Sequence, residues 1–172
     1  EPGAPQAPSD SLRETLAERV IAEDNDFIVL DKPRGLAAHG GSGVSLGAIE
    51  ALRAIRPHQE IELVHRLDRD TSGILLLAKK HSALRKVQQL IRESKVEKRY
   101  FALLKGSPAR DRFEVDAALK KNQLRGGERM VEVDEDDGKP SLSRFKVIQR
   151  FADCTLVEVQ IITGRTHQIR VH

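Results

Sequence analysis

The 172-residue chain lacks most of the features that mark secreted or membrane proteins. It has a single cysteine, Cys154, and therefore cannot form a disulfide within itself, which is typical of proteins in a reducing compartment such as the cytoplasm. Its apolar run at Ile74–Ala78 is far shorter than the roughly 20 residues that span a bilayer. No segment has the basic start and apolar centre of a signal peptide. We therefore expect a cytoplasmic protein without membrane association.

The sequence is long enough, and at 39% hydrophobic residues apolar enough, for one well-packed domain. It begins with Glu1 and contains a single methionine, Met130, so we interpret it as part of a longer product. The proline-rich opening "EPGAPQAPSD" predicts a disordered lead or linker over residues 1–19. A short helix is expected there because Ser11 and Glu14 have capping-box spacing. Residues 20–172 form the expected domain.

Basic residues are concentrated in one part of a chain whose net charge is +3. Eight lysines and arginines lie between Lys79 and Tyr100, against two acidic residues, Glu93 and Glu97. Such a stripe could follow a polyanion backbone, and it could equally be the solvated face of a helix. Composition leaves both interpretations open.

Periodicity predicts about three helices and eight strands. Helices are expected from Leu46 to Ile55, capped by Ser45, and along the apolar stripe from Ala83 to Ile91. A final helix is expected after Thr166 as N-cap. Strands are predicted for the following stretches: "DFIVLDK", "IELV", "GILLLAK", "KRYFALLKG", "RFEVDAAL", "RMVEV", "SLSRFKVIQRF" and "CTLVEVQII". "GILLLAK" is continuously apolar, as in a strand covered on both faces. This order favours an α+β fold with a mixed, mostly antiparallel sheet and flanking helices.

Two familiar motifs fit poorly. "DRDTSG" matches the start of an EF-hand loop, but its twelfth position is Lys79, where the calcium loop needs a bidentate carboxylate. "GVSLG" has the form of a serine-hydrolase elbow, but it follows a glycine-rich loop and not a buried strand. We expect Ser45 to cap a helix instead. With one cysteine and no ligand-spaced histidine pair, we expect no metal site.

The segment "HRLDRDTSGILLLAKK" places Asp68 between Arg66 and Arg69 at the start of a buried strand. Neighbouring cations favour the ionised carboxylate, which could act as a nucleophile or a general base. Arg165 in "GRTHQIR" is suited to bidentate pairing with a carboxylate or a phosphate. Structural ion pairs would give the same pattern, so the residues alone leave catalysis open.

The same segment resembles the signature H-R-L-D-x-x-T-S-G of the RluA-type pseudouridine synthases. "EKRYFALLKG" and "GRTHQIRVH" are similar to two further motifs of that family, in the same order. The resemblance runs from about Val20 to His172 and implies the pseudouridine synthase catalytic fold. It also implies that the fold continues beyond His172, so that the domain here is incomplete at its C-terminus.

The resemblance implies an isomerase that converts specific uridines in large-subunit ribosomal RNA to pseudouridine, without cofactor or metal. Asp68 matches the catalytic aspartate, and Arg66 the arginine that enters the RNA stack when the base is flipped. Tyr100 matches the tyrosine that stacks on the target base, and Arg165 the arginine that pairs with the aspartate. Attack of Asp68 on the sugar, attack on the ring and formation of a glycal all stay open. We expect a monomer. The alternative is a catalytically incomplete fragment that binds RNA.

Overall fold

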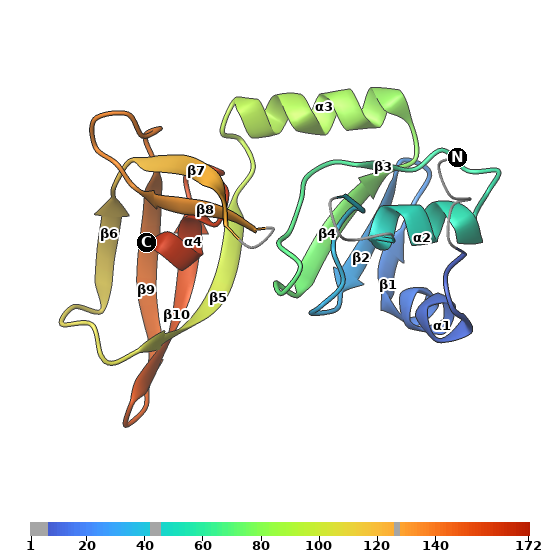
Figure 1. Ribbon diagram of the computed structural model, residues 1–172. Helices are drawn as coiled ribbons and strands as arrows, with labels where there is room; N and C mark the ends of the chain where they lie inside the picture. Colours follow the sequence, from blue (N-terminus) through green and yellow to red (C-terminus); the bar gives the residue numbers. More distant parts are fainter. Residues whose placement is uncertain (1–6, 42–45, 126–127) are drawn as a thin grey trace. The chain divides into compact units, whose positions relative to one another are not determined.

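The computed structural model describes residues 7–41, 46–125 and 128–172 and divides the chain into two compact units (Figure 1). Unit 1 comprises Glu1–Glu93 and unit 2 comprises Ser94–His172. Each unit has a sheet and a hydrophobic core of its own. All strand pairs between the described elements are antiparallel, which confirms the predicted α+β class. No helix in the described ranges is both long and apolar enough to cross a membrane.

Unit 1 is built on a four-stranded sheet in the order β1-β2-β4-β3. Its strands are β1 (Val20–Glu23), β2 (Phe27–Lys32), β3 (Glu62–Leu63) and β4 (Gly73–Ala78). Alternate residues of the central pair face one core, where Ile28 is in register with Leu77 and Leu30 with Leu75, all four fully buried. The helices are α1 (Asp10–Arg19), α2 (Ala48–Ile55) and α3 (His81–Arg92).

The helices of unit 1 begin at positions that differ from the predicted ones. Helix α1 starts before Ser11, because Ser9 Oγ accepts the hydrogen bond from Leu12 N at 3.2 Å, and Leu16 of this helix is fully buried in the core. The predicted cap Ser45 lies outside the described residues. Helix α2 begins at Ala48, and the Glu50 carboxylate accepts from Gly47 N at 3.0 Å, which satisfies a free amide of the first turn.

The sequence predicted the packing of helix α3 correctly but overstated the burial of strand β4. Ala83, Leu84 and Val87 of α3 pack on a second cluster of unit 1, as the apolar stripe predicted. The prediction that β4 is covered on both faces was wrong at its start, where the Ile74 side chain is 53% exposed. The half of β4 that carries Leu75 and Leu77 is buried, so the continuous apolar run overstated the coverage of the strand.

Unit 2 is built on a four-stranded sheet in the order β5-β10-β9-β6, with a separate hairpin β7-β8. Its elements are β5 (Lys98–Lys105), β6 (Arg112–Asp116), β7 (Leu119–Arg125), β8 (Glu128–Val133), β9 (Leu142–Arg150), β10 (Cys154–Ile161) and the short helix α4 (Gln168–Val171). Phe113 and Phe145 stack in its core with ring centroids 4.8 Å apart, beside Val157 and Val159.

Two predicted boundaries of unit 2 were wrong. The strand expected over residues 112–119 ends at Asp116, because Ala117 N and Leu119 N donate to the carbonyls of Ser141 and Lys139 at 3.1 and 3.0 Å. The chain therefore turns into the hairpin. Helix α4 begins after His167 and not after Thr166, since His167 is its N-cap with a left-handed φ of 53°.

Candidate active site

Asp68 lies in the loop that joins β3 to β4 in unit 1. It is half-buried, and its carbonyl accepts a hydrogen bond from Thr71 N at 3.1 Å, which closes a turn just before the strand. Leu67 packs against the core of unit 1, whereas Arg66 is exposed. Gly73 begins β4 with a φ of 125°, a conformation that favours glycine. The loop therefore leaves Asp68 and Arg66 near the surface while Leu67 between them is anchored.

A buried lysine holds this loop to the end of β2. Lys32 is fully buried, and its ammonium donates to the carbonyls of Arg69, Leu36 and Pro33 at 3.0, 2.6 and 3.1 Å. Gly35 reinforces the junction, because its N donates to Arg69 O at 2.9 Å and its carbonyl accepts from Arg69 Nε at 3.1 Å. Arg69 was predicted as one of two cations that flank the aspartate. Its hydrogen bonds with Lys32 and Gly35 fix the loop to the end of β2.

The charge of Lys32 is balanced by the acidic residues of the same loop. Burial lowers the pKa of Lys32, and the nearby negative charges of Asp70 and Asp68 oppose that shift. A lysine without water around it retains its proton more readily when carboxylates lie close by. Lys32 was missed in the sequence, because "DKP" looks like the polar end of a strand and its partner Arg69 lies 37 positions away.

His65 takes part in the backbone structure of unit 1. Its Nε2 lies 3.1 Å from Leu76 N and accepts a hydrogen bond from it. His65 therefore supports the strand that follows Asp68 by hydrogen bonding to its backbone.

Unit 2 carries the other two predicted site residues, Tyr100 on β5 and Arg165 in the loop before α4. Tyr100 is half-buried on the face of β5 that packs on Phe145, Val157 and Val159, and it is in register with Val159. Arg165 is exposed, and its Nε donates to the carbonyl of Pro140 at 3.1 Å. The predicted pairing of Arg165 with Asp68 joins residues of different units and stays a prediction.

Gln168 fixes the shape of the Arg165 loop. This buried side chain accepts hydrogen bonds from Arg165 N at 3.0 Å and Thr163 Oγ1 at 2.7 Å. Its amide nitrogen donates to Leu142 O at 3.0 Å and Ser143 Oγ at 2.9 Å. All four hydrogen-bonding positions of the amide are used. Sequence reasoning missed this residue because its partners on β9 lie 25 and 26 positions away.

Lys98, the first residue of β5, lies beside the same loop. It is in register with Ile161 at the end of β10, and its ammonium would lie 3.0 Å from a Cβ added to Gly164. Burial lowers the pKa of Lys98. Lys98 belongs to the basic stripe of the sequence, where nothing in the pattern signals its burial.

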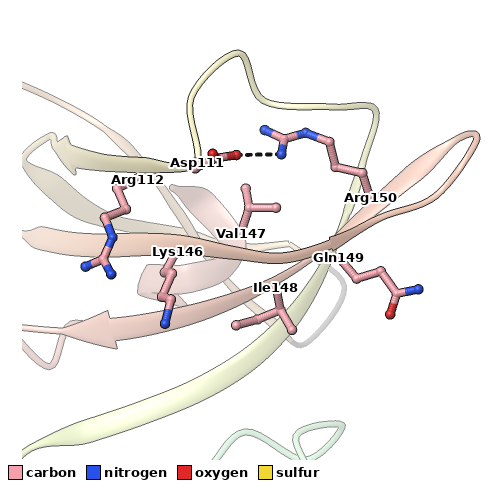
Figure 2. A pocket seen from close by; sticks show the side chains of 7 residues that line it. All are labelled: Asp111, Arg112, Lys146, Val147, Ile148, Gln149 and Arg150. Atoms are coloured by element: carbon pink, nitrogen blue, oxygen red, sulfur yellow. Dashed lines mark hydrogen bonds and ion pairs between the residues drawn. The ribbon is translucent and has the colours of Figure 1, made fainter.

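A hollow of about 450 Å³ at the β6–β9 edge of unit 2 is a poor candidate for chemistry (Figure 2). Arg112 and Lys146 line it, and Arg150 is paired with Asp111 at 2.6 Å. Lys146 is in register with Glu158, whereas Tyr100 is in register with Val159. Because neighbouring residues of a strand face opposite sides of a sheet, Lys146 and Tyr100 occupy different faces. The hollow is therefore separate from the Tyr100 face.

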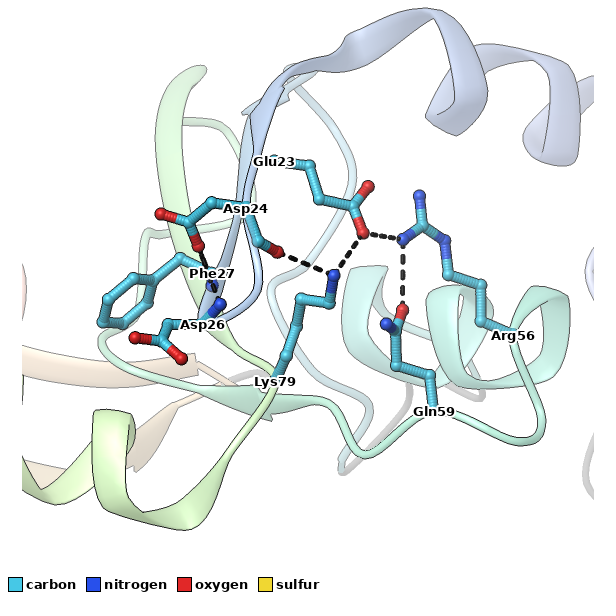
Figure 3. A network of polar contacts seen from close by, with 7 residues as sticks. All are labelled: Glu23, Asp24, Asp26, Phe27, Arg56, Gln59 and Lys79. Atoms are coloured by element: carbon cyan, nitrogen blue, oxygen red, sulfur yellow. Dashed lines mark hydrogen bonds and ion pairs between the residues drawn. The ribbon is translucent and has the colours of Figure 1, made fainter.

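Lys79 and Lys80, the first two lysines of the basic stripe, form ion pairs with carboxylates of unit 1. Lys79 Nζ donates to Glu23 at 2.8 Å and to the carbonyl of Asp24 at 2.7 Å, and Arg56 donates to the same Glu23 oxygen at 2.7 Å (Figure 3). The two hydrogen bonds lower the pKa of Glu23 to about 2, and the one from Arg56 has the larger effect. Lys80 is paired with Asp26 at 2.8 Å. No group of metal-binding side chains occurs in the described part of the chain.

Comparisons with known proteins agree with this fold. A family model described as RNA pseudouridylate synthase matches residues 26–172, and the chain belongs to this family. The family resemblance of the sequence motifs is thereby confirmed. The human structure titled RNA Pseudouridylate Synthase Domain Containing 4 superimposes with a TM-score of 0.77 at 27% identity, covering 94% of this chain and 66% of that one.

Two curated relatives carry the name Ribosomal large subunit pseudouridine synthase C. The protein from Escherichia coli (strain K12) is 54% identical over 158 residues, and the one from Haemophilus influenzae is 52% identical over 158 residues. Both alignments cover 91% of this chain and 49% of the relative. The chain thus spans about half the length of the curated relatives it matches.

Proposed function

We propose that this chain carries catalytic machinery for converting uridines of large-subunit ribosomal RNA to pseudouridine. The family match over residues 26–172 and the relatives named as large-subunit synthases support this proposal most directly. The placement of Asp68 on a loop tied down by Lys32 supports it further, because a reacting carboxylate must be held in a defined position. The protein would act in the cytoplasm, as a monomer, on ribosomal RNA.

The reaction is an isomerisation in which the bond from the ribose C1′ to uracil N1 breaks and a bond from C1′ to C5 forms. The C5 proton leaves and N1 gains one, so no cofactor is needed for balance. The target nucleotide must first leave the RNA stack, at a cost of a few kcal/mol. In this proposal Arg66 fills the vacated space, Tyr100 stacks on the base, Asp68 reacts, and Arg165 pairs with Asp68.

Helix α3 supplies a surface suited to the RNA backbone. Its residues Arg85, Lys86 and Arg92 are exposed, and no described carboxylate forms an ion pair with them. Ala83 and Val87, on the other side of the helix, pack on unit 1. Unpaired lysines and arginines on one face can neutralise successive phosphates, which makes binding strongly dependent on salt.

The test measures tritium released to water from large-subunit ribosomal RNA labelled at C5 of uridine. The chain should release tritium, and Asp68→Asn should abolish release while RNA binding persists. Glu60→Gln is the control, because it removes one carboxylate charge from an exposed position of unit 1 outside the Asp68 loop. Equal loss in both variants would contradict a specific role for Asp68. RNA binding without any release by the unaltered chain would favour the alternative, an RNA-binding fragment with an incomplete site.

A further inference from the structure

The ammonium of Lys98 is a half-buried positive charge for which the described part of unit 2 supplies no counter-charge. Burial lowers its pKa, and no ion pair joins it to a carboxylate in the described part of unit 2. Taking an unpaired charge out of water is costly, and buried lysines are ordinarily paired. Lys32 illustrates the usual solution, with three carbonyls around its ammonium.

The position of Lys98 follows from the antiparallel pairing of β5 and β10. The first residue of β5 lies beside Ile161, the last residue of β10, and hence beside the loop that continues through Gly164 to Arg165. Lys98 and Tyr100 are two residues apart on one strand and therefore face the same side of the sheet. The end of the sheet where β5 begins and β10 ends therefore carries Lys98 and Tyr100 and leads into the loop with Arg165.

We propose that Lys98 binds a phosphate group of the RNA next to the flipped nucleotide. This inference depends on the proposed function, since it takes Tyr100 to mark where the target base is held. A phosphate supplies the missing negative charge, and a charge-assisted hydrogen bond to it is stronger than one to a neutral uracil carbonyl. Lysine is well suited to this role because its ammonium acts as a compact point charge.

Gly164 provides a way to move the ammonium without removing it. The backbone of Gly164 has no left-handed φ, so alanine fits its conformation. A Cβ at this position would lie 3.0 Å from Lys98 Nζ, the mobile end of a long side chain, and would displace it at little cost to the fold. Gly164→Ala therefore tests the placement of the charge, whereas Lys98→Met removes the charge itself.

The experiment compares kcat/KM for tritium release from labelled large-subunit ribosomal RNA at several salt concentrations. Lys98→Met should lower kcat/KM about 10- to 100-fold, the value of one charge-assisted contact. It should also make the logarithmic salt dependence shallower by about 0.7, as expected for one phosphate contact fewer on a single strand. Gly164→Ala should cause a smaller loss, and the double variant should be no worse than Lys98→Met alone. Lys105→Met is the control, because it removes one exposed charge from the other end of β5.

Any of three results would overturn the inference, and the first two concern Lys98→Met. One is a Lys98→Met variant with unchanged kcat/KM, and the other is a loss of activity with an unchanged salt dependence, which would indicate a structural role. Additive effects of Lys98→Met and Gly164→Ala would also contradict it, because the two changes would then act independently. If the unaltered chain releases no tritium, the proposed function fails separately, and the same variants are compared by the salt dependence of RNA binding. A slope unchanged by Lys98→Met would then refute the phosphate contact.

Discussion

Replacing Gln168 by methionine should destabilise unit 2 and disturb the loop that carries Arg165. Methionine has a similar length but cannot donate or accept in place of the amide. Four hydrogen bonds are lost, each with a net value of about 1 kcal/mol, which sets an upper limit near 4 kcal/mol. The change therefore tests how much of the loop depends on this one side chain.

The expected loss is below that limit because three of the four partners retain another hydrogen bond. Leu142 O also accepts from Ile162 N at 3.0 Å, and Thr163 Oγ1 accepts from Leu142 N at 3.1 Å. Ser143 Oγ keeps a contact of 2.9 Å with His172 Nδ1. A group that keeps one partner avoids most of the penalty for an unsatisfied buried atom, so we expect a loss of about 2–3 kcal/mol.

Tyrosine fluorescence during urea unfolding provides the measurement. The chain has one tyrosine, Tyr100, and no tryptophan, so this signal reports on the sheet of unit 2. Gln149→Met, at an exposed position on β9, serves as the control and should change the unfolding free energy by less than about 0.5 kcal/mol. A loss below about 1 kcal/mol for Gln168→Met, or an equal loss in the control, would refute the reasoning.

Three further predictions concern unit 1. Above the ordinary pKa of 4.5 the ionised Glu23 stabilises the fold, and this contribution is lost as pH falls through about 2. Glu23→Gln should therefore cost about 1 kcal/mol at pH 7, after allowance for solvent screening, and almost nothing near pH 2 in urea unfolding; a pH-independent difference would contradict this. Lys32→Met should speed amide hydrogen exchange at Gly35 at least about tenfold, since Arg69 O then has fewer fixed neighbours, whereas the exposed control Lys80→Met should not. Arg66→Ala should reduce turnover strongly and RNA affinity less, and equal losses in single-turnover and binding assays would argue against its role in base flipping.

Regular elements could be predicted from the sequence where their periodicity is complete. The alternation in β5, β9 and β10 and the apolar stripe of α3 come directly from the fit of these residues to a half-buried surface. Strand β1 was missed, because its four residues are mostly exposed and show no alternation. Strand β7 was also missed, and the predicted strand at β6 ran three residues too far, since the turn between them depends on hydrogen bonds to residues 139 and 141.

In the candidate site, too, some residues could be predicted from the sequence and others could not. The residues proposed to react or to face the RNA were predicted from long motifs, and the family match confirms the family to which these motifs belong. The residues that support them were not found. Lys32, Lys98 and Gln168 are polar side chains whose burial depends on partners distant in sequence, and a polar residue without periodicity is read as exposed.

The three carbonyls around Lys32 have a consequence for proton transfer near Asp68. An ammonium has three N–H bonds, and Lys32 directs its hydrogen bonds to three separate backbone oxygens. Lys32 cannot donate a proton to a nucleotide without losing one of these three hydrogen bonds, which would loosen the loop. In the proposed reaction Lys32 would therefore hold the loop in place without transferring a proton, and Asp68 would have to exchange protons by another route.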